Sequence, residues 1–409
     1  MVLLSTQQKS VEIGAQYKLP STSSIVSRNL VKVLPSNGTS FEQNNQITIQ
    51  IPSVNFLDVS GSYLSFIIDT AATKTLVSDN SQAWIERLRV SSGNNEVLYD
   101  IMSYNILNGI TETLLSNKIY KENAGDVLEG TKTINTRVLQ TGEKTGQRRC
   151  IQLLGGILDN NSTYFPLKYT NGLIIDIFVA SDSKVSTEGL KISDVSYACE
   201  FLEMDSQYTA AFEEQFLTTG IKYAFDTYTA SQSTITTTNA NKQITENVRS
   251  LKTVYAVQQI AADKINVFRQ ARLKTILWKY GSIYVPSQAL SGEFGAAEIL
   301  KETIKAVNLS NDQSYDVDIG VTGDSGWSDT WDNASTKFII GQNFELSPSQ
   351  SMSGADATRK PLSVQLTYSE SGVTQFNPAK DADSAITLTT FVHYDVIAIF
   401  GPSGTQLVY

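Results

Sequence analysis

The sequence predicts an all-β protein built from two tandem antiparallel β-sandwiches with short inserted helices. Strand-favouring residues set its composition, with 18 Tyr and 16 Phe in 409 residues. About sixteen short strand-like runs are separated by polar turns. A strand–turn–strand–helix pattern also occurs once in each half of the chain. Two jelly rolls of ~eight strands each fit these observations, whereas a parallel α/β sheet does not.

The first copy of the repeated pattern spans residues 86–116. A strand leads to a polar turn at residues 93–95, and a second short strand runs through Val97 and Leu98. A helix is predicted next, because apolar side chains recur four residues apart and so share one helix face. Those side chains are Ile106, Ile110 and Leu114.

The second copy spans residues 272–309. It contains a strand, a tight turn around Gly281, and a short aromatic strand that we expect to end at Pro286. An amphipathic helix follows, with Glu298 early and Lys305 late, the order that a helix dipole favours. Its predicted buried face consists of Ala297, Leu300, Ile304 and Val307. The repetition of the whole pattern predicts a duplicated β domain.

Taken in order, the first half begins with a polar arm over residues 1–27, which either frays or becomes ordered against a neighbour or a surface. The run around Ser60 and Gly61 reads as a strand pair or a bulged strand. Residues 117–147 form a long polar loop of the kind that usually is functional or contacts a partner. The other strands of this half are predicted at residues 29–34, 46–52, 150–154, 173–180 and 194–204.

The second half begins after residues 205–220, where the strand-like pattern gives way to a short helix or connector. We therefore expect the first jelly roll to span residues 28–212 and the second to span residues 213–409. Residues 233–243 read as a loop or an edge hairpin, and residues 310–336 as a polar insertion. The other strands of this half are predicted at residues 221–228, 251–258, 337–340, 362–368 and 386–400.

Few residues support catalysis. His393 is the single histidine, and Asp395 lies only two residues away on the same strand, so the pair lacks the third partner of a Ser-His-Asp triad. Acidic pairs of the kind that cleave glycosides are better explained as solvated loop residues. These pairs are Glu213 with Glu214, Asp316 with Asp318, and Asp381 with Asp383. We therefore predict a protein that is not an enzyme.

The remaining composition excludes several other classes of site. Cys150 and Cys199 lie in apolar runs and are expected to be free thiols, so neither a disulfide framework nor a metal site is predicted. No phosphate-binding glycine motif occurs, and no cofactor is expected. The net charge of −9 argues against binding nucleic acid through a basic face. The first residues lack the pattern of a secretion signal, which predicts synthesis in a reducing cytosol.

Three segments together resemble double jelly-roll major capsid proteins, the family of virophages, polinton-like viruses, adenoviruses and related tailless phages. They are IPSVNFLDVSGSYLSFIID at residues 51–69, ILWKYGSIYVPSQALSGEFGAAEILKETIKAV at residues 276–307, and FVHYDVIAIF at residues 391–400. They occur in both halves of the chain in the family's order, and none is a catalytic signature. The motif residues are Asp58, Tyr63, Gly281, Tyr284 and Pro286.

The resemblance implies a structural protein of a virion, made in the host cytoplasm. It implies that three copies close into a ring of six jelly rolls, and that these trimers tile an icosahedral face against neighbouring capsomers. Residues 1–27 are then expected at the base of the capsomer, where they contact neighbours, minor or penton proteins, or an internal membrane. No sequence-specific binding of nucleic acid is implied.

Other interpretations stay open. A secreted or surface carbohydrate-binding adhesin would also be β-rich, and Trp327 and Trp331 in the polar insertion would form its ligand platform. Packing of these two indoles on their own domain is at least as probable. A minor capsid or spike protein is a close relative of the preferred interpretation, and a sandwich glycosidase comes third.

Overall fold

The structure is a computed structural model, and it describes most of the chain. The described residues are 24–69, 81–129, 147–181, 185, 189–260, 263, 265–271, 273–292, 296–308, 337–346, 352–368 and 385–408.

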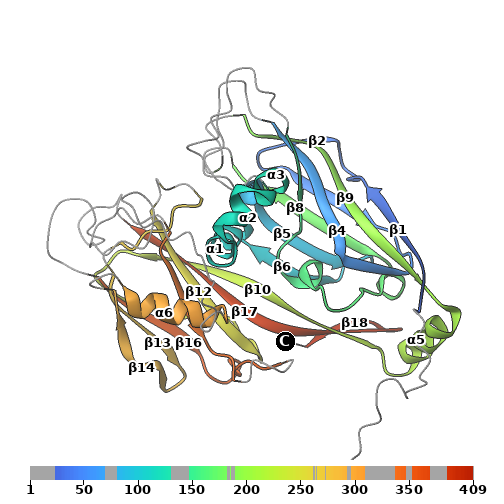
Figure 1. Ribbon diagram of the computed structural model, residues 1–409. Coiled ribbons are helices and arrows are strands. Elements are labelled where there is room, and N and C mark those ends of the chain that lie inside the picture. The colour runs from blue at the N-terminus through green and yellow to red at the C-terminus, as the bar shows by residue number, and fades with distance from the viewer. Residues whose placement is uncertain are drawn as a thin grey trace, which may run out of the picture.

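Two antiparallel sheets form the first sandwich (Figure 1). One sheet has the order β1-β9-β4-β7, and β2 also pairs with β9. The facing sheet has the order β3-β8-β5-β6. The bounds are β1 Ile25–Val33, β2 Ser40–Glu42, β3 Gln46–Ile51, β4 Phe56–Asp69, β5 Ile85–Ser92, β6 Val97–Met102, β7 Gln147–Ile151, β8 Leu173–Val179 and β9 Lys191–Met204.

The second sandwich repeats this arrangement. One sheet has the order β10-β17-β12-β15, with β18 added on β17, and the other has the order β11-β16-β13-β14. The bounds are β10 Ile221–Ile235, β11 Asn239–Ile244, β12 Leu251–Ile260, β13 Leu273–Tyr280, β14 Ile283–Ser291, β15 Ile339–Asn343, β16 Leu362–Tyr368, β17 Ile386–Gly401 and β18 Gly404–Val408.

The two sandwiches have the same connectivity. The sheet β10-β17-β12-β15 repeats the sheet β1-β9-β4-β7 strand by strand. In the same way, β11-β16-β13-β14 repeats β3-β8-β5-β6. The repeated pattern seen in the sequence is β5-β6-α1 in the first sandwich and β13-β14-α6 in the second. The prediction of an all-β fold with two tandem antiparallel sandwiches and inserted helices is confirmed.

Alternating apolar residues build the core of both sandwiches. In β8, Leu173, Ile175, Ile177 and Val179 are buried and point to one face, whereas the residues between them are only partly buried. These and the other inward-facing side chains belong to one apolar cluster that extends through both sandwiches. The hydrophobic effect therefore holds the two sandwiches together as well as folding each of them.

The helices lie in the connections. They are α1 Tyr104–Leu115, α2 Lys118–Glu122, α3 Ala124–Leu128, α5 Ser206–Thr218 and α6 Ala297–Ala306, with short 3₁₀ turns η2 Ser81–Trp84, η4 Gly156–Asp159 and η5 Leu167–Thr170. The predicted face of α1 is confirmed, since Ile106, Ile110 and Leu114 are buried. The predicted loop at residues 117–147 contains α2 and α3, while residues 130–146 and 309–336 lie outside the described residues.

The buried face of α6 differs from the prediction. Ile299, Thr303 and Ala306 are buried, whereas Ala297 is exposed and Leu300, Ile304 and Val307 are only partly buried. The reason is that Thr303 is fully buried. Its hydroxyl donates to the Ile299 carbonyl at 2.8 Å, with the Ile339 carbonyl of β15 at 3.2 Å, and accepts from the Gly341 N–H at 2.8 Å. The centre of the buried face is therefore a polar residue, which the spacing of apolar residues does not predict.

β14 also extends beyond its predicted end. It runs past the cis Val285–Pro286 peptide bond to Ser291. It is an edge strand with a register irregularity opposite Ile276 and Trp278, and an edge strand tolerates proline because its outward N–H groups need no partner. Residues 233–243 include the end of β10 and most of the edge strand β11, but these two strands belong to different sheets and do not form the hairpin that was one of the two interpretations. The domain division at residue 213 falls inside α5 and stays a prediction.

Candidate assembly surfaces

A long ribbon of the second sandwich packs against the first. The paired strands β10 and β17 leave the second sandwich and run beneath the first, with β18 alongside (Figure 1). Phe165 of the first sandwich meets Tyr223 of β10 and Phe400 of β17 edge to face, with ring centroids 5.2 Å and 5.7 Å apart. Such aromatic pairs contribute free energy beyond that of their buried area, so they stabilise the contact between the two sandwiches.

Hydrogen bonds surround this apolar contact. The Asn160 side chain donates to the Ala224 carbonyl at 2.9 Å, and the Gln232 side chain donates to the Ser103 hydroxyl at 3.1 Å. The Thr405 N–H at the start of β18 donates to a Glu96 carboxylate oxygen at 3.1 Å. A buried apolar centre with a polar rim is the composition of a specific protein interface.

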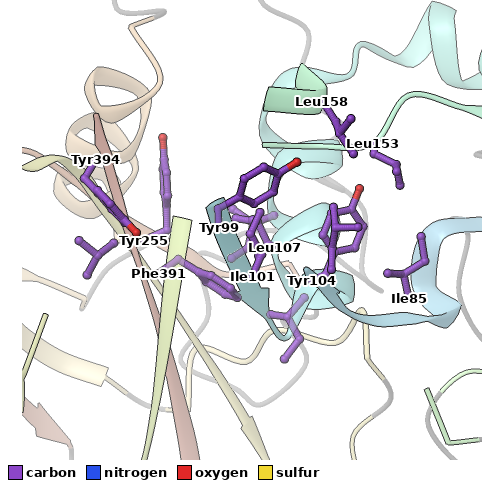
Figure 2. Close-up of a cluster of buried hydrophobic side chains, with 14 of the residues drawn as sticks. Ile85, Tyr99, Ile101, Tyr104, Leu107, Leu153, Leu158, Tyr255, Phe391 and Tyr394 are labelled. Carbon is purple, nitrogen blue, oxygen red and sulfur yellow. The ribbon is translucent and has the colours of Figure 1, made fainter. Parts of the chain in front are cut away.

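Figure 2 shows the centre of the shared apolar cluster. Tyr99 and Ile101 of β6 lie there with Tyr104 of α1, and Phe391 of β17 lies beside them. The Tyr104 hydroxyl donates to the Gln82 side chain at 2.8 Å and accepts from the Leu154 N–H at 2.7 Å. Burial raises the pKa of this phenol well above its usual range, so it stays protonated and structural.

Charged residues gather on the second sandwich close to this contact. His393 Nε2 lies 2.8 Å from Asp226 Oδ2, and its imidazole stacks on Tyr228 with centroids 4.4 Å apart. Lys252 bridges Asp226 at 3.2 Å and Asp395 at 3.5 Å. Burial alone would raise the pKa of Asp226, but the hydrogen bond with His393 and the charges of His393 and Lys252 outweigh it and lower the pKa. The partner of His393 is therefore Asp226 on the neighbouring strand rather than Asp395.

Asp159 lies at the end of η4, near this charged group. Its carboxylate accepts a hydrogen bond from the Gly155 N–H at 3.1 Å. Burial raises its pKa to about 6, and the nearby negative charge of Asp226 acts in the same direction. His393, Asp226 and Asp159 were not predicted to meet, because three distant segments bring them together.

Asp58 and Tyr63, two of the predicted motif residues, lie on β4. The Asp58 carboxylate is buried, accepts from the Ser60 N–H and hydroxyl at 3.0 Å and 2.6 Å, and forms an ion pair with Arg28 of β1 at 3.1 Å. The register of β4 against β9 shifts between Asp58 and Tyr63, as the bulged-strand interpretation predicted. The ion pair between Arg28 and Asp58 links β1 to β4 across β9. Asp58 therefore helps to position the edge strand β1.

Gly281, Tyr284 and Pro286 lie together on the hairpin of β13 and β14. Gly281 has a φ of +62°, a conformation that glycine adopts without strain, and its N–H donates to the Pro361 carbonyl at 2.9 Å. Tyr284 is exposed, and the Lys279 ammonium lies 5.8 Å from its ring centroid. The five motif residues thus occupy two separate places, one in each sandwich.

Large apolar side chains are exposed on several outer elements. β1 is exposed along both of its faces and lies at the edge of its sheet, with Val26, Leu30 and Leu34 in or just after it. Ile283 and Tyr284 of β14 and Leu346 after β15 are exposed as well. The sequence predicted a strand at residues 29–34 but gave no sign that its apolar side chains would be exposed. On an edge strand such as β1, exposed apolar side chains are candidates for contact with another chain.

The described residues also bear on the predictions about metal sites, acidic pairs and membrane spans. No cluster of three or more metal-ligating side chains occurs in that part of the chain. Glu213 forms an exposed ion pair with Lys168 at 3.2 Å. No helix within the described ranges is long and apolar enough to cross a membrane. Trp327, Trp331, Asp316, Asp318, Asp381, Asp383 and residues 1–23 lie outside the described residues.

Comparisons with known proteins show which structures share this fold. No family model and no curated protein match the sequence. The Faustovirus major capsid protein is similar in structure with a TM-score of 0.64 at 9% identity, over 96% of this chain and 93% of that one. A chain of the PBCV-1 virus capsid gives 0.61 at 10% identity, over 96% and 99%. The mavirus major capsid protein gives 0.52 at 10% identity, over 100% and 96%.

Proposed function

We propose that this chain, which has the double jelly-roll fold of viral major capsid proteins, is a major capsid protein whose trimers form pseudo-hexameric capsomers that tile an icosahedral shell. One observation carries the proposal: two sandwiches with the same strand order fill the chain, and the similarity to the capsid proteins covers nearly its full length. Three such chains present six similar sandwiches, which suits a six-sided tile.

The proposed role is structural rather than enzymatic. The protein's place is the virion, and its synthesis takes place in the host cytoplasm. Its partners are two further copies in the capsomer and the neighbouring capsomers. Residues 1–27 contact minor or penton proteins or an internal membrane. The net charge of −9 keeps separate trimers in solution before assembly, because like charges repel.

Light scattering after size-exclusion chromatography tests the proposal. The expected result is a particle of about three times the 44.9 kDa chain mass. Electron micrographs of concentrated material should then show hexagonal outlines or closed shells. A stable monomer that binds glycans would overturn the proposal in favour of an adhesin.

Deletion of residues 1–23 tests the role of the arm. The described fold begins at Ser24, whose carbonyl accepts a hydrogen bond from the Asp205 N–H at 2.8 Å, so the deletion leaves the first sandwich intact. Trimers should persist while shells become less stable to dilution. Loss of trimers on deletion would contradict this division of roles.

A further inference from the structure

A tyrosine ring lies between the two sandwiches at their contact. The ring of Tyr228 on β10 stacks on the imidazole of His393, with centroids 4.4 Å apart and an angle of 10° between the planes. A Cβ on Gly155 of the first sandwich would lie 3.3 Å from the same tyrosine ring, so the backbone before η4 contacts it directly. His393 of the second sandwich is therefore one aromatic ring away from the first sandwich.

His393 has a hydrogen-bond partner at each ring nitrogen. Nε2 lies 2.8 Å from Asp226 Oδ2, and Nδ1 lies 3.2 Å from the Thr253 hydroxyl, which can accept or donate. The imidazole therefore keeps both partners whether it is neutral or charged. Only the charged form makes an ion pair with Asp226 and places a cation over the Tyr228 ring, and this side chain is only 13% exposed. Protonation of His393 thus strengthens its contacts in the fold.

The second sandwich adds a lysine and further carboxylates to this site. Lys252 of β12 lies 3.2 Å from Asp226 and 3.5 Å from Asp395. The Ser250 hydroxyl also donates to Asp395 at 2.6 Å. Burial alone would lower the pKa of Lys252, but the nearby carboxylates, Asp226 first and then Asp395, outweigh it and raise the pKa. Glu345, which follows β15, acts on Lys252 in the same direction, so Lys252 stays positive.

Asp159 brings a titratable group from the first sandwich to the same place. Its carboxylate accepts from the N–H of Gly155, the residue that contacts the Tyr228 ring. Burial raises the pKa of Asp159 to about 6, and the negative Asp226 acts in the same direction, whereas a positive His393 acts in the opposite direction. The phenols in and beside the contact stay neutral because burial raises the pKa of each. These phenols are Tyr99, Tyr104, Tyr223, Tyr228 and Tyr255.

Two protons therefore set the charge at the contact between the sandwiches. When His393 and Asp159 both hold a proton, the imidazolium and Lys252 face Asp226 and Asp395. When both protons are lost, Lys252 alone faces three carboxylates, and the group is more negative by two charges. Like charges that are partly buried at close range raise the free energy of the ionised form, so this contact favours the protonated form.

We propose that His393 and Asp159 act together as a proton-sensitive clasp between the two sandwiches, which is tight in mild acid and loosens as both protons leave. Histidine ordinarily changes its charge between pH 5 and pH 8, which places the change around neutral pH. The clasp lies within one chain, so it does not rest on the proposed trimer. In a capsomer it makes each chain stiffer in mild acid than at alkaline pH.

Hydrogen exchange tests the clasp at the strand that it holds. Exchange is measured at pH 5.5 and pH 8, and each rate is corrected for the intrinsic rate of an unfolded peptide at that pH. The protection of residues 221–227 of β10 should fall about tenfold or more between the two, since a pKa shift of one unit changes an equilibrium by this factor. Protection of residues 362–368 of β16, in the other sheet of the second sandwich, should stay the same.

Single substitutions separate the two protons. Asp159→Asn and His393→Gln each remove one titrating group, so each should keep only part of the dependence on pH, and the double variant should show none. Glu86→Gln changes an exposed carboxylate and should keep the full dependence.

Nuclear magnetic resonance gives a second measurement that does not need a variant of His393. His393 is the single histidine, so its ring signals can be assigned directly. Because the charges of Asp159 and His393 act on each other, Asp159→Asn should move the midpoint of the histidine titration to lower pH. An unchanged midpoint would show that the two groups are not coupled and would overturn the clasp.

The outcomes also separate this inference from the proposed function. Protection of β10 that is equal at both pH values in the wild type, or that falls equally in β16, would overturn the clasp and leave the capsomer standing. A monomeric wild-type chain whose β10 protection falls with rising pH would overturn the capsomer and support the clasp.

Discussion

At the scale of single residues, the charged group beside the sandwich contact links stability to pH. Asp159 is partly buried with a backbone N–H as its hydrogen-bond donor, and the negative Asp226 lies nearby. An unfolded aspartate has a pKa of about 3.9, whereas the pKa of Asp159 in the fold is about 6. Folding therefore takes up a proton between roughly pH 4 and pH 6.

The first prediction concerns Asp159→Asn. The buried carboxylate weakens the fold above its folded pKa, and this penalty disappears as the pH falls toward the unfolded pKa. The amide variant keeps an acceptor for the Gly155 N–H without the charge. It should raise the free energy of unfolding by about 2 kcal/mol at pH 7.5 and by little at pH 4.5. Urea unfolding at both pH values measures the difference, with the exposed Glu86→Gln as control. An equal effect at both pH values would contradict the assignment.

The second prediction concerns Asp58, which holds β1 in place. Asp58→Ala leaves Arg28 without one of its two carboxylates and removes the oxygen that accepts from both the N–H and the hydroxyl of Ser60. We expect a loss of about 2–3 kcal/mol in the free energy of unfolding. Hydrogen exchange should rise in β1 and in the bulge of β4. As control, Glu203→Ala removes an exposed carboxylate that accepts a hydrogen bond from the Ser27 hydroxyl of β1 at 2.8 Å, and it should leave exchange in β4 unchanged. Unaltered exchange in β1 of the Asp58 variant would count against this role.

At the scale of elements, α6 is fixed to its sandwich by a hydroxyl group. Thr303 bonds the Ile339 carbonyl and the Gly341 N–H of β15, and Gly341 has no side chain to keep the helix at a distance. A Cβ at Gly341 would lie 3.0 Å from the Thr303 Cα. The helix therefore packs closer to the strand than an apolar contact between larger side chains would allow.

The third prediction compares two threonines. Thr303→Val keeps the shape but leaves the buried Gly341 N–H without its acceptor, which should cost about 1–3 kcal/mol. Thr113 in α1 is also buried, but its hydroxyl only donates to the Gly109 carbonyl one turn earlier. Thr113→Val should cost less than about 1 kcal/mol. Thermal unfolding of both variants measures this, and equal losses would refute the special role of Thr303.

Periodicity in the sequence predicted the elements better than it predicted their contacts. The strands of both sandwiches and the α1 face follow from alternation and from the spacing of Ile106, Ile110 and Leu114, because apolar burial dominates there. The prediction of the buried face of α6 was wrong because a buried threonine replaces an apolar residue. The prediction of β14 ended too early because proline is tolerated in an edge strand. The short strands β2 and β18 carry too few residues to show a pattern. The His393–Asp226–Asp159 group joins three distant segments, which no local signal reveals.

At the scale of the whole molecule, duplication accounts for the shape of the chain and for its open surfaces. A jelly roll that is doubled keeps the same strand order in both halves. The two halves contact each other within the chain through Phe165, Tyr223 and Phe400. The sequence could reveal the duplication through the repeated strand–turn–strand–helix pattern, but not which edges stay uncovered, because exposure depends on how the two sandwiches meet.

The fourth prediction tests whether the sandwiches act as one body. Phe165 packs against Tyr223 and Phe400 across the contact, whereas Phe66, equally buried, packs against Trp84 inside the first sandwich. Either residue changed to alanine should cost about 3–5 kcal/mol. Hydrogen exchange should distinguish them. Phe165→Ala should expose residues 221–227 of β10 and residues 396–400 of β17, while Phe66→Ala should increase exchange around β4 and leave β10 protected. If both variants open β10 alike, stability is shared through the whole cluster rather than through Phe165, and the contact between sandwiches cannot be assigned to these rings.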